Sequence, residues 1–188
     1  FPSPHRNHTV AEVVTLMERM RTAAFIYQTG FGADAGRHDI EAEIRDMGWL
    51  RHIYRLPPVG PDTGAPFAGL MAGADAAPPP VRDPNHVVYL AFTSGSTGRP
   101  KGVMHSDNTL LVTARAISRD WHIGPDSVVY SLSPFSHNLG LGSLLTSLVG
   151  GAEYVVHDLP RGDSLVDRLI DIGATYLIGV PTHAIDLL

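Results

Sequence analysis

The stretch from Tyr89 to Ser106 reads YLAFTSGSTGRPKGVMHS. An apolar run, typical of a buried strand, changes at Thr93 into hydroxyl and glycine residues, and a single lysine, Lys101, follows. Glycine permits positive φ and a close approach of the backbone, so consecutive N–H groups can turn toward one anion. Hydroxyl groups add donors, and the ammonium group of Lys101 adds a point charge suited to phosphate. The candidate phosphate-binding residues are Thr93, Ser94, Gly95, Ser96, Thr97, Gly98 and Lys101.

Two alternative interpretations of this stretch fit less well. A flexible Gly/Ser linker rarely leaves an apolar strand directly, and it rarely carries a single lysine framed by Pro100 and Gly102. The phosphate loop of nucleoside triphosphatases requires Gly-Lys-Ser/Thr at the start of a helix. Here Arg99 and Pro100 separate Gly98 from the lysine, and a proline prevents that helical continuation.

Composition restricts the class of protein. The chain has 188 residues, of which 44% are hydrophobic and 18% charged, as in a globular domain. A net charge of -5 argues against nucleic acid or an anionic membrane as the main partner. Cysteine is absent, and the ten histidines show no paired ligand spacing, so no metal site is predicted. No signal peptide is visible, and proline and glycine interrupt the uncharged segment 127–152, so we expect a cytoplasmic protein without a membrane span.

The flanking sequence predicts alternating helices and strands. The expected helices begin near residues 10, 40, 107, 139, 165 and 181, and the expected strands lie at 23–27, 52–56, 87–92, 127–132, 153–157 and 175–179. Thr9, Asp39 and Ser106 or Asp107 are the expected N-caps. This alternation predicts a doubly wound α/β fold with a mostly parallel sheet and with ligands at the carboxyl ends of the strands.

A proline-rich stretch interrupts this alternation. Residues 57–85 hold eight of the fifteen prolines, which predicts a long irregular connection at the surface. We therefore expect one α/β domain fragment over 1–188. It has helix–strand units at 1–56, the connection at 57–85, and the phosphate-loop and acid-site half at 86–188.

A second candidate site follows the strand expected at 127–132, and we expect it at the same sheet edge as the phosphate loop. His137, in the segment 133–142 after this strand, either hydrogen-bonds a ligand carboxylate or satisfies backbone groups at the strand end. Gly140 and Gly142 are expected to leave room for a ligand. His183 either lines the pocket or begins a helix, and His105 is expected to be structural.

The run from Thr93 to Gly102 resembles the phosphate-binding signature of the adenylate-forming superfamily. This superfamily includes acyl-CoA synthetases, luciferases and the adenylation domains of nonribosomal peptide synthetases. The segment Pro134–Gly140 is similar to the proline–aromatic–His–x–x–Gly element of that family, although Ser136 stands where many acyl-CoA synthetases have an aromatic residue. The pair His137-Asn138 is instead similar to aryl-acid-activating members, in which the asparagine contacts the substrate. Selectivity between acyl and aryl acids is left open.

The resemblance implies an AMP-forming carboxylic acid–CoA ligase that uses ATP, Mg²⁺ and CoA. His137 and Asn138 would orient a small-molecule carboxylic acid, and Gly140 and His183 would border it. The family's Tyr-Gly-x-Thr-Glu element and C-terminal catalytic lysine are not found. We therefore expect an internal fragment of the family's large N-terminal domain, inactive without the remainder of its chain and its C-terminal lid domain. Self-association is left open.

Three rival interpretations remain at this stage. One is a nucleotide- or phosphate-binding module without adenylation activity. Another is an aryl-acid or peptide-synthetase-type adenylation domain. The third is a protein–protein module that uses the proline-rich stretch.

Overall fold

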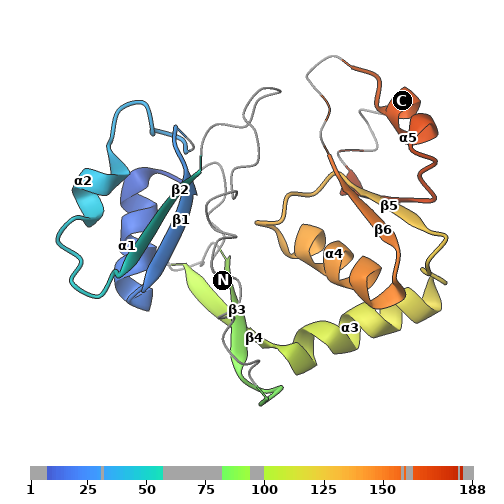
Figure 1. The fold of residues 1–188 in the computed structure, drawn as a ribbon, viewed down its shortest axis with the longest axis horizontal. Helices are drawn as coiled ribbons and strands as arrows, with labels where there is room; N and C mark the ends of the chain where they lie inside the picture. The colour runs from blue at the N-terminus through green and yellow to red at the C-terminus, as the bar shows by residue number, and fades with distance from the viewer. Residues whose placement is uncertain are drawn as a thin grey trace, which may run out of the picture. The chain divides into compact units, whose positions relative to one another are not determined.

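The computed structural model describes residues 8–30, 32–56, 82–93, 100–157, 159, 163–181 and 183. The chain forms two compact units, one of Pro4–Pro80 and one of Phe1–Ser3 with Val81–Leu188 (Figure 1). The expectation of a single domain fragment over 1–188 stays a prediction. Most of the proline-rich connection expected at 57–85 lies outside the described residues, which resume at 82.

The first unit contains two helix–strand pairs. They are α1 (Val10–Met20), β1 (Ala24–Gln28), α2 (Ile40–Ile44) and β2 (His52–Leu56). The strands β1 and β2 pair in parallel, from Ala24 opposite His52 to Gln28 opposite Leu56, as the alternation predicted. The helix α2 ends at Ile44.

Local side chains begin both helices of this unit. The Thr9 hydroxyl accepts a hydrogen bond from the Glu12 N–H at 3.3 Å, and the Glu12 carboxylate accepts from the Thr9 N–H at 2.8 Å. This capping box starts α1 at the predicted residue. The Asp39 carboxylate accepts from the Glu41 N–H at 3.0 Å and starts α2. Between the helices and the strands lies a core of Met17, Phe25, Ile44 and Met47.

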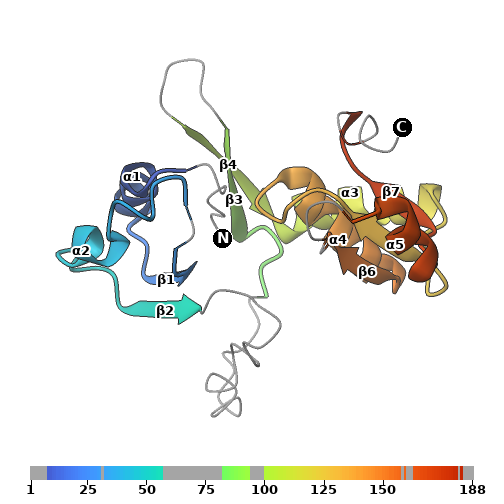
Figure 2. The same ribbon diagram turned by 90° about the horizontal axis from the view of Figure 1, so that it is seen from above.

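In its described residues the second unit contains a hairpin, three helices and a parallel sheet (Figure 2). Its elements are β3 (Val87–Thr93), β4 (Lys101–Ser106), α3 (Asp107–Asp120), β5 (Val128–Ser131), α4 (Asn138–Gly150), β6 (Glu153–Val156), α5 (Leu165–Asp171) and β7 (Tyr176–Ile178). The sheet has the order β6-β5-β7, and both of its ladders are parallel. The α/β fold class predicted from the sequence is confirmed.

The hairpin corrects one expectation about the phosphate loop. The strand β3 pairs antiparallel with β4, in a two-stranded sheet separate from β6-β5-β7. We expected the phosphate loop and the His137 segment at one edge of a single parallel sheet, and that arrangement is wrong. The apolar residues after Lys101 form a strand that folds back on β3, with Val103 opposite Ala91.

The helices α3 and α4 approach closely because small residues lie between them. A Cβ atom at Gly150 would stand 2.5 Å from the Ile123 carbonyl oxygen and 3.0 Å from Ser118 Oγ. The Ser118 hydroxyl donates to that same carbonyl at 3.1 Å, so the buried polar groups are satisfied. Within the described ranges, no helix is both long enough and apolar enough to cross a membrane.

Candidate functional site

The hairpin brings together the two ends of the predicted phosphate loop. Thr93 and Lys101 are register partners at the loop end of β3 and β4, and the Thr93 hydroxyl donates to the Lys101 carbonyl at 3.5 Å. Both residues are exposed. No carboxylate in the described part of the chain forms a salt bridge with Lys101. The other predicted phosphate-binding residues, Ser94 to Gly98, lie outside the described residues.

His137 lies at the start of α4, where it is the N-cap residue. Its backbone N–H donates to the Pro134 carbonyl at 2.9 Å, and its side chain forms no capping hydrogen bond. The imidazole is exposed. Because the first N–H groups of a helix have no partner within the helix, the start of α4 favours an anionic group. A carboxylate or phosphate there would meet both these N–H groups and the His137 ring.

Gly140 is needed for a reason that differs from our expectation. A Cβ atom there would stand 2.2 Å from the Pro134 carbonyl oxygen and 2.6 Å from that of Ser133. The Cβ side of Gly140 is therefore filled by the chain's own backbone, and its place beside a substrate stays a prediction. Gly142 does have open space, with no atom within 4 Å of its Cβ position.

Tyr154 of β6 contacts both the turn before α4 and the first turn of that helix. Its hydroxyl donates to the Gly140 carbonyl at 3.1 Å, and its ring stacks on Phe135 with 5.8 Å between ring centres. The Ser143 hydroxyl donates to the same carbonyl at 2.9 Å. These contacts fix the backbone that carries His137 and Asn138.

Tyr89 connects the hairpin to α4. Its hydroxyl donates to Oδ1 of Asn138 at 3.3 Å, although the two residues are 49 positions apart. Tyr89 is 7% exposed, and burial raises the pKa of its phenol. His105 stacks on the Tyr89 ring with 5.7 Å between ring centres, a packing contact that agrees with a structural role. The sequence alone did not place Tyr89 in the site, since its partner is distant in sequence.

His183 stabilises the turn after β7. Its ring nitrogen Nδ1 accepts a hydrogen bond from the Val180 N–H at 3.3 Å. The backbone N–H of His183 donates to the Val180 carbonyl at 2.8 Å. The ring packs against Gly179, where an added Cβ would stand 3.1 Å from Nδ1. Among the described contacts, none joins His183 to His137 or Asn138, so its role toward a substrate stays a prediction.

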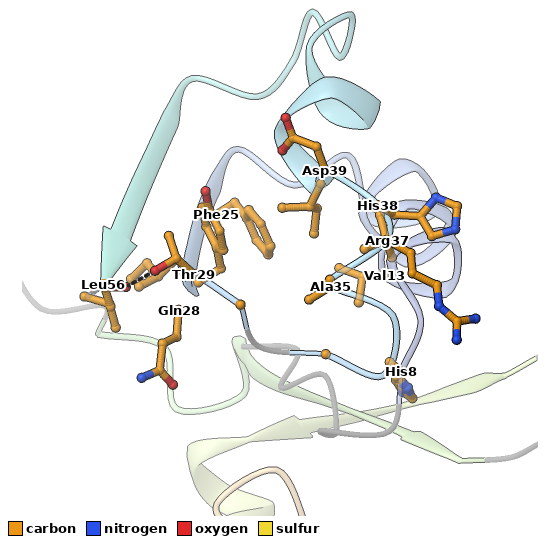
Figure 3. A pocket seen from close by; sticks show the side chains of 17 residues that line it. His8, Val13, Phe25, Gln28, Thr29, Ala35, Arg37, His38, Asp39 and Leu56 are labelled. Atoms are coloured by element: carbon orange, nitrogen blue, oxygen red, sulfur yellow. Dashed lines mark hydrogen bonds between the residues drawn. The ribbon is translucent and has the colours of Figure 1, made fainter. Parts of the chain in front are cut away.

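A cavity of about 670 Å³ lies in the first unit, and none of the predicted site residues lines it. In Figure 3, Phe25, Thr29 and Leu56 lie on one side of it, and Val13 and Ala35 on the other. The Asp39 carboxylate beside it already caps α2. Among the described residues, no group of three or more His, Cys, Asp or Glu is placed to hold a metal ion.

Known proteins resemble this chain in sequence and in structure. It is 34% identical over 102 residues to D-lysergyl-peptide-synthetase subunit 1 of Claviceps purpurea, a match of 54% of this chain and 3% of that protein. It is 40% identical over 98 residues to malformin synthetase mlfA of Aspergillus homomorphus (strain CBS 101889), covering 52% of this chain and 2% of the synthetase. ATP-bound MatB from Rhodopseudomonas palustris superposes with a TM-score of 0.72 at 25% identity, over 96% of this chain and 34% of MatB. The chain thus spans a small part of the synthetases and about a third of MatB.

The match to a protein family is more extensive. A sequence model described as AMP-binding enzyme matches residues 6–188. This match includes the hairpin and the parallel sheet of the second unit, together with all the described elements of the first. The adenylate-forming family predicted from Thr93–Gly102 is therefore confirmed, and the chain belongs to the family of AMP-binding enzymes.

Proposed function

We propose that the protein activates a carboxylic acid with ATP and transfers the acyl group to the thiol of CoA. In the first step an oxygen of the carboxylate attacks the α-phosphorus of ATP, the bond to the bridging oxygen breaks, and pyrophosphate leaves. In the second step the thiol sulfur attacks the acyl carbon and AMP leaves. A carboxylate alone has no good leaving group, and forming the mixed anhydride supplies one.

The observation that carries this proposal is the pairing of Thr93 and Lys101 at the end of the hairpin. The exposed ammonium group, free of any described carboxylate, is available to neutralise the β- and γ-phosphates as pyrophosphate departs. We assign the hydroxyl and N–H groups of residues 94–98 to the same phosphates. Mg²⁺ would enter with the nucleotide and shield its phosphate oxygens.

The start of α4 is assigned to the acid. His137 and Asn138 are exposed there, next to helix N–H groups that have no side-chain cap. The helix dipole and these donors favour a carboxylate. The hydrogen bond from Tyr89 to Asn138 joins this position to the strand that leads into the phosphate loop. Adenylation depends on such positioning, because the carboxylate must meet the α-phosphorus in line.

The test is ATP–pyrophosphate exchange by the full-length protein over a panel of carboxylic acids, with Lys101→Ala as the variant. Loss of a charge-assisted contact is expected to lower the exchange rate roughly 10- to 100-fold. Arg119→Ala removes a positive charge from an exposed residue whose partner is the adjacent Asp120, and it is expected to leave the rate unchanged. An unchanged rate in Lys101→Ala would remove the lysine from the phosphate site.

A second candidate acceptor is the thiol of a carrier protein. The identities of 34% and 40% to peptide synthetases favour it, although they extend over only about half of the chain. Thioester formation from the best acid should be compared with free CoA and with a phosphopantetheinylated carrier protein. Transfer to the carrier alone would exclude the CoA ligase and retain the adenylation step.

A further inference from the structure

Tyr89 is held in one position by its surroundings. It lies within β3, is 7% exposed, and has the His105 ring stacked on it at 5.7 Å between centres. Its hydroxyl reaches the side chain of Asn138, the first residue of α4, at 3.3 Å. The buried phenol is held in place, so it determines how the exposed amide is presented.

The hydrogen bond between the two groups gives the orientation of the amide. The Tyr89 hydroxyl donates to Oδ1 of Asn138, which leaves the two N–H donors of Nδ2 on the other side. Burial raises the pKa of Tyr89, so the phenol stays protonated and able to donate. No described residue accepts a hydrogen bond from Nδ2.

We propose that Tyr89 is a positioning residue that makes Asn138 present its NH2 group, and not its carbonyl, to the acid substrate. The inference rests on the proposed function, since it assigns the contact to the acid bound at the start of α4. The NH2 group then favours a substrate that places a hydrogen-bond acceptor next to it, and a carboxylate oxygen of the acid is that acceptor. A free Asn138 would present either end, so half of its orientations would place a carbonyl oxygen against the carboxylate.

The first test is Tyr89→Phe in the full-length protein, with ATP–pyrophosphate exchange measured for the acid that wild type uses best. Loss of one neutral hydrogen bond is expected to raise KM for the acid about 2- to 12-fold and to leave KM for ATP unchanged. Tyr176→Phe is the matched control, because it removes a hydroxyl that donates to the Trp121 carbonyl on another part of the unit. Unfolding midpoints are compared alongside, so that loss of folding is separated from loss of positioning.

Two further variants distinguish positioning from packing. Asn138→Ala should abolish the effect of Tyr89→Phe, because the phenol then has no amide to orient. Asn138→Asp keeps the acceptor for Tyr89 but replaces the NH2 group with an anionic oxygen, and it should raise KM for the acid by more than Tyr89→Phe does. Additive effects of the Tyr89 and Asn138 changes, or equal effects on KM for ATP and for the acid, would overturn the inference.

The same measurements separate this inference from the function on which it rests. If wild type exchanges pyrophosphate with no acid in the panel, the proposed function fails and the inference fails with it. If wild type is active and Tyr89→Phe retains its KM for the acid, only the inference fails.

Discussion

Gly140 occupies a position where a single methyl group has no room. Its neighbours are backbone carbonyl oxygens, the nearest 2.2 Å from an added Cβ, and backbone cannot move aside as a flexible side chain can. Gly140→Ala should therefore lower the free energy of unfolding by about 1–3 kcal/mol. The change is measured from the urea midpoint of the purified variant.

The control lies two residues further along the same helix. Gly142 has no atom within 4 Å of its Cβ position, so alanine there adds helix propensity without a clash. Gly142→Ala should stabilise the protein by up to about 1 kcal/mol. If both alanine variants changed the free energy of unfolding equally, the turn at 133–134 would be able to move away from α4 without loss of stability.

Between elements, Glu41 of α2 is the residue that joins the helix to both strands of the first unit. Its carboxylate accepts hydrogen bonds from the Arg55 guanidinium on β2 and from the Tyr27 hydroxyl on β1. These contacts, with Arg55 as the larger cause, lower the pKa of Glu41 from its ordinary value of 4.5 to about 2.

A lowered pKa in the folded state fixes the pH range in which this carboxylate contributes. Its contribution is fully present above about pH 4.5 and is lost as the pH falls to about 2. Between pH 6 and pH 2.5 the urea midpoint of wild type should therefore fall further than that of Glu41→Gln, which lacks the charge throughout. Parallel curves for the two proteins would show that the carboxylate contributes nothing.

Helix caps could be predicted from the sequence, whereas contacts between distant elements could not. The caps at Thr9, Asp39, Ser106 and Ser164 were predictable because each bonds an N–H two or three residues away. The pairing of β3 with β4 was not predicted, because the short apolar piece after Lys101 was not recognised as a strand. The connection between the two strands is too short for a parallel crossover, so a hairpin is the arrangement that it allows. The contact between Tyr89 and Asn138 was not predicted either, because only the folded chain brings the two residues together.

At the scale of the whole molecule, each unit has its own buried hydrophobic residues and its own tryptophan. Trp49 packs against the core of Met17, Phe25 and Ile44, and the Arg21 guanidinium lies 5.7 Å above its ring. Trp121 follows α3 in the other unit, and its carbonyl accepts a hydrogen bond from the Tyr176 hydroxyl. The sequence has two tryptophans, so each single-tryptophan variant reports on one unit.

The division into two compact units predicts that they lose their structure separately. In a Trp121→Phe background, unfolding by urea at pH 6 is followed by the fluorescence of Trp49. Glu41→Gln should lower this unfolding midpoint, because the carboxylate joins elements of the first unit alone. With Trp49→Phe as background, the same change should leave the Trp121 midpoint where it was. A domain that unfolds as one cooperative body would shift both midpoints equally, since any loss of stability is then shared by every probe. That result would favour the single domain expected from the sequence, and unequal shifts would favour two separately stable units within the matched region.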